Sequence, residues 1–265
     1  MVDTLIHSGF VVTIDGQRRI LKDGAIAIDG NVIVDVGTTS ELKKKHRPDK
    51  IVDASRKAVL PGLIDLHSHA GGLIKFDTSH IPTFGDRHKP PIKANLRYLM
   101  DHIEFRASSK ELWYVESLLV ALERVKCGTT CGMVMLGGAP RGDDPVYAEM
   151  NAKGVEEVGI RTIIGVGPGR PPWPKEFCDW KNGKRIDKMV TREQSLKATE
   201  DAIRKLNNTA NGRIRVFTSL ARFGAPSPGD PMYALESQYM GEALQQTREI
   251  REITTKYKTG LHVHT

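Results

Sequence analysis

The chain of 265 residues has few cysteines, few aromatic side chains and no long apolar segment. Its three cysteines are an odd number without the spacing of a disulfide framework, which is typical of proteins from a reducing compartment. No segment approaches the ~18 apolar residues of a membrane-spanning helix, and the N-terminus lacks the layout of a secretory signal. The sequence therefore predicts a cytoplasmic protein with no disulfide and no membrane partner.

Charge is nearly balanced, with 39 basic against 32 acidic residues, and the basic residues are dispersed. The densest basic run, from Lys43 to Arg47, is interpreted as a solvated turn. Aromatic residues make up only 6% of the chain, and none is interleaved with this run as a base-stacking surface would require. We expect no nucleic-acid partner, and an apolar content of 39% is enough for a globular core.

The most informative motif lies in residues 58–70, AVLPGLIDLHSHA. Its apolar first part predicts a short buried strand. Because side chains two apart on a strand share a face, Asp65, His67 and His69 are expected together on one side. Two neighbouring imidazoles can bind one divalent ion, with Asp65 behind them to orient them. Spacing alone leaves the alternative open that the histidines only bind backbone groups or water.

The segment from Pro61 to His69 resembles the first barrel strand of the metal-dependent amidohydrolase superfamily. Members of that family carry PGxIDxHxH where a small β domain is followed by a (β/α) barrel, and every fixed position is matched here. The resemblance implies half of a β-sandwich in residues 1–58 and an incomplete hydrolase barrel in residues 59–265. An independent small sheet is the alternative interpretation of the first segment.

Strand and helix patterns alternate after residue 58, which is typical of βαβ units with a parallel sheet. The expected strands are 59–69, 129–136, 161–167, 213–220 and 260–265. The predicted fold class is therefore α/β, a partial TIM-type (β/α) barrel of about five parallel strands preceded by a small β-sandwich half. Eight strands close such a barrel. We expect a truncated part of a longer enzyme, with open sheet edges that make it sticky and weakly active or inactive alone.

Two segments between these strands give more specific expectations. A Ser-x-x-Glu pattern predicts that a helix begins at Ser108. Its buried stripe is expected to consist of apolar residues: Leu112, Val115, Leu118, Leu119, Leu122 and Val125. The proline-rich segment 168–174 is expected to form a rigid rim over the mouth of the barrel, with packing of a loop as an equal alternative. Arg170, Trp173 and His262 are the candidates for contact with substrate at this rim.

A second histidine pair, His262 and His264, ends the sequence. In the resemblance, His264 falls on the metal-binding histidine of the fifth barrel strand, whereas His262 matches no essential ligand. His67, His69 and His264 would then hold the metal, although an unremarkable pair in a terminal strand is the alternative. The acid and base residues that move protons in the resembling enzymes are expected beyond Thr265, so the catalytic residues are unknown.

The resemblance implies a hydrolase that cleaves non-peptide carbon–nitrogen bonds of a small molecule with metal-activated water, of amidohydrolase or deaminase type. Zinc is the expected metal, with iron or manganese as alternatives. The expected fourth strand has no lysine, which favours a one-metal site. Pro226 stands where nucleoside and triazine hydrolases have a substrate-contacting histidine, which argues against purine-like substrates. The alternatives are a cyclic-amide hydrolase with two metals and a non-catalytic interaction protein of the same fold, and a homo-oligomer is left open.

Overall fold

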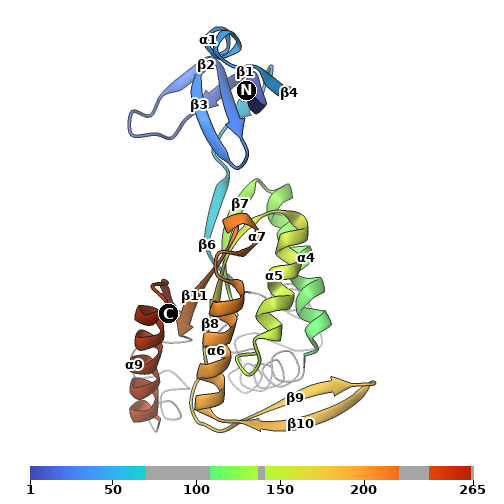
Figure 1. The fold of residues 1–265 in the computed structure, drawn as a ribbon, viewed down its shortest axis with the longest axis vertical. Helices are drawn as coiled ribbons and strands as arrows, with labels where there is room; N and C mark the ends of the chain where they lie inside the picture. Colours follow the sequence, from blue (N-terminus) through green and yellow to red (C-terminus); the bar gives the residue numbers. More distant parts are fainter. Residues whose placement is uncertain (70–107, 137–140, 221–238, 264–265) are drawn as a thin grey trace, which may run out of the picture. The chain divides into compact units, whose positions relative to one another are not determined.

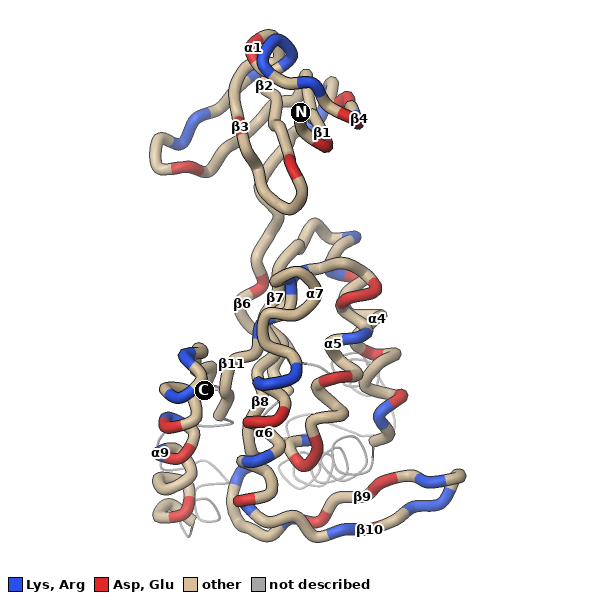
Figure 2. Tube along the Cα trace, viewed as in Figure 1, with Lys and Arg blue, Asp and Glu red and all other residues tan. Residues whose placement is uncertain are grey.

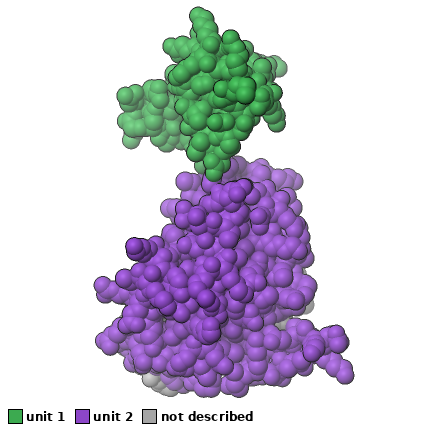
Figure 3. All heavy atoms as spheres, in the orientation of Figure 1, with its two compact units in different colours: residues 1–62 green, residues 63–265 purple. Residues whose placement is uncertain are grey.

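The computed structural model describes residues 1–69, 108–136, 141–220 and 239–263 (Figure 1). Arg170, His67, His69 and His262 lie in these ranges. His264 and Pro226 lie outside the described residues. The chain divides into two compact units, residues 1–62 and 63–265 (Figure 3). No described helix is long and apolar enough to cross a membrane.

The first unit is a five-stranded sheet with one helix. Its elements are β1 (Val2–Val12), β2 (Ile20–Asp29), β3 (Val32–Thr38), α1 (Thr39–Lys45), β4 (Pro48–Asp53) and β5 (Ala58–Val59). The order is β3-β2-β1-β4, and β5 also pairs with β1. β2 and β3 form an antiparallel hairpin, whereas β4 runs parallel to β1 because α1 returns the chain to its starting end. β5 continues in the direction of β4 and pairs with the last part of β1.

The basic run was predicted as a turn, and this prediction is wrong because its first three residues form the last turn of α1. Thr38 and Glu41 cap the helix reciprocally, a pattern that was readable in the sequence. Lysines at the C-terminal end of a helix interact favourably with its dipole. Lys45 and His46 also bind the carboxylate of Asp35, and their hydrogen bonds lower the pKa of Asp35 to about 2.

The second unit contains a curled sheet of five parallel strands in the order β12-β11-β8-β7-β6. The strands are β6 (Leu63–His69), β7 (Thr129–Met135), β8 (Arg161–Val166), β11 (Ile214–Leu220) and β12 (Leu261–Val263). The helices are α4 (Lys110–Lys126), α5 (Val146–Val158), α6 (Arg192–Leu206), α7 (Thr209–Gly212) and α9 (Met240–Lys256). This half-barrel confirms the predicted α/β fold class of a partial TIM-type barrel. Basic and acidic residues are interspersed along its helices (Figure 2).

The main hydrophobic core lies between the sheet and the helices. Val134, Ile164 and Val216, one from each of the three central strands, are at most 2% exposed and contribute to this core. Because side chains alternate along a strand, the residues between them face the opposite, concave side of the sheet. A Cβ on Gly165 would lie 2.8 Å from Met133 Cε and 3.3 Å from Ser219 Cβ, so these three residues share that concave side.

Helix α4 buries a different face from the one predicted. Its cap is Ser109, whose Oγ accepts from Leu112 N, while Ser108 accepts a hydrogen bond from the indole of the buried Trp113. The buried residues are Trp113, Glu116, Ser117, Ala121 and Arg124, whereas Val115, Leu119, Leu122 and Val125 of the predicted stripe are 44–48% exposed. The small residues Ser117 and Ala121 allow close packing with α5. A Cβ on Gly154 of α5 would lie 2.8 Å from Tyr114 O, which shows how near the two backbones are.

Strand β6 was predicted to be buried, and this prediction is also wrong. Leu63, Ile64 and Leu66 are 60%, 65% and 77% exposed. β6 is the edge strand of its sheet and pairs only with β7, so the described structure has no second strand beside it. Apolar residues on an unpaired edge strand promote association with other chains. This edge and the apolar stripe of α4 leave two exposed apolar surfaces on the second unit.

The segment after β8 contains a hairpin that was not predicted, β9 (Lys175–Lys181) and β10 (Lys184–Val190). Its turn is Asn182-Gly183, with φ values of 52° and 73°, the sequence and backbone of a tight two-residue hairpin turn. Phe177 and Trp180, which follow the proline-rich segment, lie on β9. The Asn-Gly pair was the signal for this hairpin.

A buried arginine attaches this hairpin to the rest of the unit. Arg141 donates two hydrogen bonds of 2.9 Å to the carboxylate of Asp143 and a third to Ser108 O, and both charged side chains are 0% exposed. Asp179 of β9 and Lys188 of β10 complete the network through contacts of 3.2 Å to Arg141 and 3.0 Å to Asp143. Burial disfavours the charge of Arg141, but bonding to Asp143 outweighs it and raises the pKa of Arg141.

We expect Leu119→Lys, together with Leu122→Lys, to reduce self-association without loss of the fold. Both leucines are exposed, at 48% and 44%, so their replacement should change the free energy of unfolding by no more than about 0.5 kcal/mol each. Light scattering during gel filtration measures the association. Ala121→Lys, at a fully buried position of the same helix, is the matched control that should unfold the unit. Unchanged association of the double variant would contradict the expectation.

Arg141→Met should destabilise the second unit by about 3–5 kcal/mol, because it leaves the buried carboxylate of Asp143 without its partner. Urea denaturation measures this loss, and limited proteolysis should cleave the released hairpin earlier. Arg185→Met is the control, since Arg185 lies on the same hairpin but its side chain is 38% exposed. Equal stability of the two variants would show that the buried network does not hold the hairpin.

Candidate metal centre

Three imidazole rings from the two edge strands of the half-barrel lie together. His67 and His69 are on β6, and His262 is on β12. His67 Nε2 lies 3.2 Å from His69 Nε2, and His67 Nδ1 lies 2.7 Å from His262 Nε2. The edge strands are separated by three others in the sheet, so only its strong curl allows their side chains to touch. The predicted proximity of His67 and His69 is therefore present, and His262 joins them.

Asp65 does not share the face of the two histidines, contrary to the expectation. Asp65 pairs with Gly132 and Ser68 pairs with Val134, so β6 advances by three residues where β7 advances by two. This β-bulge places one extra residue in β6 and shifts the alternation of its side chains. Asp65 and Ser68 both face helix α4, while His67 and His69 remain on the concave side.

Arg124 of α4 holds the bulge from the helix side. Its Nη2 donates to Asp65 Oδ2 at 3.0 Å and to Ser68 Oγ, and its side chain is only 9% exposed. Asp65 Oδ1 in turn accepts the backbone N–H of His67 at 3.1 Å. Gly132 leaves room for this guanidinium, because a Cβ there would lie 2.7 Å from Arg124 Nη1 and would force it to shift. Asp65 therefore orients His67 through the backbone, with Arg124 as its partner.

The facing nitrogens of His67 and His69 fit a single zinc ion. Two nitrogens bound at about 2.0–2.1 Å to one tetrahedral zinc lie about 3.3–3.4 Å apart, close to the observed 3.2 Å. In the described ranges, no group of three His, Cys, Asp or Glu side chains converges on a point that could hold a metal ion. His262 does not complete such a group, because it binds the opposite nitrogen of the His67 ring. Burial, and to a smaller extent His67, lower the pKa of His262.

The concave side next to the histidines is mostly apolar. Strand register places His69, Met135, Gly165 and Phe217 side by side in one layer across four strands. Met135 is only 2% exposed. Such a lining excludes water from one side of the imidazole pair, while Gly165 leaves space that a side chain would fill.

The predicted rim residues occupy the loop that follows β8. Arg170 and Trp173 are both half-buried. The indole N–H of Trp173 donates to Gln246 Oε1 at 2.8 Å, and Gln246 Nε2 donates to Gly169 O at 3.1 Å. Gln246 lies on α9 and is 4% exposed. The polar atom of Trp173 is thus used to attach the loop to a helix, which agrees with the packing alternative.

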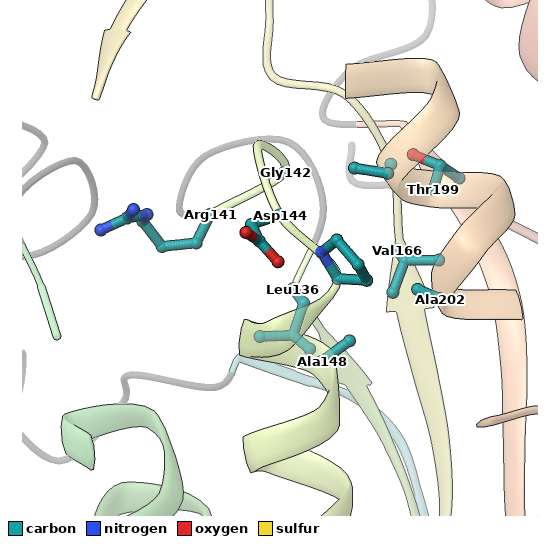
Figure 4. Close-up of a pocket in the computed structure, with 11 residues that line it drawn as sticks. Leu136, Arg141, Gly142, Asp144, Ala148, Val166, Thr199 and Ala202 are labelled. Atoms are coloured by element: carbon teal, nitrogen blue, oxygen red, sulfur yellow. The ribbon is translucent and has the colours of Figure 1, made fainter. Parts of the chain in front are cut away.

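A small cavity between α5, α6 and the sheet is separate from the histidines (Figure 4). Leu136 and Val166, which contribute to the main core, line it together with Ala148 and Ala202. It leaves about 20 Å³, enough for about one water molecule. The cavity therefore lies on the helix side of the sheet and cannot hold a substrate.

The roles of Arg124 and Gln246 were not identified from the sequence. For Arg124, the spacing of its helix contained a signal. Trp113, Ser117, Ala121 and Arg124 recur at helical spacing, and an arginine at the end of such a stripe indicates a buried partner. The expected pattern followed the larger leucines and valines instead. Gln246 lies on an amphipathic helix with no motif around it, so its role depends on a contact distant in sequence.

Comparisons with known proteins agree with this fold. Residues 24–47 match the family model of the imidazolonepropionase-like composite domain of bacteria. The chain is 27% identical over 246 residues to the 5'-deoxyadenosine deaminase of Methanobrevibacter smithii, an alignment that covers 91% of this chain and 43% of that protein. It is 32% identical over 170 residues to 5-methylthioadenosine/S-adenosylhomocysteine deaminase 1 of Syntrophus aciditrophicus, covering 62% of this chain and 33% of that one.

The fold is also similar to that of atrazine chlorohydrolase from Arthrobacter aurescens in complex with zinc. The TM-score is 0.68 at 18% identity, and the match covers 98% of this chain and 52% of that one. The chain thus spans about half the length, or less, of the relatives that it matches. The matched first-strand motif, the parallel half-barrel and these relatives together place the chain in the amidohydrolase superfamily, in the branch that contains deaminases and chlorohydrolases.

Proposed function

We propose that the chain carries the first metal-binding strand of a hydrolase that cleaves non-peptide carbon–nitrogen bonds of a small molecule, in a deaminase-type reaction. The observation that carries this proposal is the pair of Nε2 atoms of His67 and His69, which face each other at 3.2 Å. Two imidazole nitrogens at this separation match the edge of a zinc coordination tetrahedron. The two relatives named above that are deaminases support the same reaction class.

Zinc is the metal that fits best. Neutral imidazole is a common ligand of zinc, and the atrazine chlorohydrolase of similar fold contains zinc. His264 is the proposed third ligand, since it follows β12 two residues after His262. β11 contains no lysine, so a one-metal site is favoured over the two-metal site of a cyclic-amide hydrolase.

When bound, a zinc ion lowers the pKa of a coordinated water and makes it a nucleophile near neutral pH. The residues of this chain position that chemistry. Arg124 and Asp65 hold the bulge that presents His67, and Met135 and Phe217 supply an apolar wall beside His69. The groups that move protons are proposed to lie outside the described residues.

The proposed substrate is a small nitrogen heterocycle with an amino group. Two relatives are named for deamination of adenine-containing compounds. Pro226 replaces a histidine that contacts substrate in the resembling enzymes, so a substrate other than a purine nucleoside is favoured. The non-catalytic alternative remains a separate proposal, in which the fold serves only for protein contacts.

We expect the intact 265-residue protein to bind about one equivalent of zinc, measured by mass spectrometry of the metal after dialysis. His67→Ala and His69→Ala should weaken zinc binding by more than the roughly 10–100-fold that loss of an outer-shell partner costs. His46→Ala is the control, since His46 lies in the first unit and binds Asp35. No uptake of zinc, iron or manganese by the wild-type protein would contradict the proposal, and two equivalents would favour the two-metal alternative.

The reaction class is tested by product analysis at high concentration of the zinc-loaded protein. Aminated purines, pyrimidines and triazines are compared with cyclic amides, and we expect release of ammonia from an aminated heterocycle. A metal chelator and His69→Ala should both abolish this release, because each removes the proposed nucleophile. Opening of a cyclic amide without ammonia would favour the two-metal alternative. Zinc binding without turnover of any compound would favour the non-catalytic one.

A further inference from the structure

The two ring nitrogens of His67 face different partners. Nε2 faces His69, whereas Nδ1 lies 2.7 Å from His262 Nε2, which is hydrogen-bond distance. A neutral imidazole has one N–H and one lone pair, so a proton on one nitrogen decides what the other can do. A metal needs the lone pair on its own nitrogen. The proton of His67 must therefore be on Nδ1 if Nε2 is to bind zinc.

The contact between His67 and His262 has the geometry of an in-line hydrogen bond. The two rings are nearly coplanar, with an angle of 24° between their planes and 5.0 Å between their centroids. The distance between the ring centroids exceeds the distance between the two nitrogens by about two ring radii. The two centroids and the two nitrogens therefore lie nearly on one line, and the hydrogen bond lies in the plane of each ring. An N–H in the plane of one ring therefore points directly at the lone pair of the other.

Both rings are held by their surroundings. The backbone N–H of His67 binds Asp65, which is paired with Arg124. His262 pairs with Ser219 of β11, and Gly260 lies directly before the strand that carries His262, where a Cβ would lie 2.4 Å from Phe217 Cε2. This close packing fixes β12 against β11. The approach of the two imidazoles thus results from the sheet itself rather than from free side chains.

We propose that His262 is a positioning residue for His67. The Nδ1–H of His67 donates to Nε2 of His262, which fixes the orientation and tautomer of His67 and leaves its Nε2 lone pair facing His69. Metal-binding histidines commonly donate their second N–H to a carboxylate, a backbone carbonyl or a water molecule. Here the acceptor is an imidazole from the opposite edge of the sheet. The inference rests on the proposed function, because it concerns the same metal-binding pair.

A direct metal contact by His262 fits the geometry less well. Its near nitrogen points at Nδ1 of His67, on the opposite side of the ring from the Nε2 pair. It would have to leave this bond and rotate to reach an ion between His67 and His69. Contact with substrate at a rim is also less suited, because the same nitrogen is already occupied by His67.

The experiment first measures the tautomer of His67 in the metal-free intact protein by nitrogen-15 NMR of labelled imidazoles. We expect a protonated Nδ1 and an unprotonated Nε2 for His67. In His262→Phe the acceptor is absent, so His67 should revert to the Nε2–H form that free neutral imidazole prefers. His262→Gln retains an acceptor oxygen and should restore the Nδ1–H form.

Zinc affinity is then measured by competition with a chromophoric chelator. We expect His262→Phe to weaken zinc binding about 10–100-fold and His262→Gln to recover part of this loss. The matched control is His46→Phe, which removes a half-buried histidine from the first unit and should leave zinc affinity unchanged. Circular dichroism verifies that each variant is folded. If His262→Phe does not fold, the tautomer of His67 in the wild-type protein still tests whether His67 donates from Nδ1.

Three results would overturn the inference. These are an Nε2–H tautomer of His67 in the wild-type protein, unchanged tautomer and affinity in His262→Phe, or nitrogen shifts on zinc addition that identify His262 itself as a ligand. The proposed function fails separately, if the wild-type protein binds no metal. Normal zinc binding in both the wild-type protein and His262→Phe would overturn only the role of His262.

Discussion

The contact between the two edge strands of the half-barrel is the constraint on which the candidate site depends. In a flat sheet of five strands, β6 and β12 would lie about 19 Å apart, given a spacing of about 4.8 Å between neighbouring strands. His67 and His262 nevertheless approach to 2.7 Å. Two histidine side chains cannot span the flat distance, so the curl of the sheet creates the cluster. Any change that flattens the sheet would separate the imidazoles without altering a single histidine.

The curled sheet is closely packed on both of its sides around the imidazole cluster. On the concave side, Gly165 leaves space among Met133 and Ser219 where a Cβ would collide. On the helix side, Gly132 admits Arg124, which binds the bulge in β6. The bulge turns Asp65 toward the helices and keeps the histidines on the other side. The charged groups that orient His67 are therefore separated from the surface that would meet substrate.

Much of this architecture was predictable from the sequence, because strand positions depend on local patterns. All five parallel strands and the closeness of His67 and His69 followed from apolar runs and two-residue spacing. The bulge was not predictable, since it arises from pairing with β7, which lies some sixty residues further along the chain. The buried face of α4 was predicted wrongly, because close packing against Gly154 selects small residues over leucines. The hairpin at Asn182-Gly183 was missed although its turn was readable.

The exposed edge of β6 links stability to chemistry. Its leucines are exposed because the described structure provides no neighbour on that side, and His67 on the same strand is exposed for the same reason. Hydrolysis by a metal-bound water needs a site from which bulk water is largely excluded. A surface that covered β6 would bury Leu63 and Leu66 and would also enclose the imidazole pair. Burial of these side chains, at roughly 1.5–3 kcal/mol each, would then contribute to assembling the candidate metal site as well as to folding.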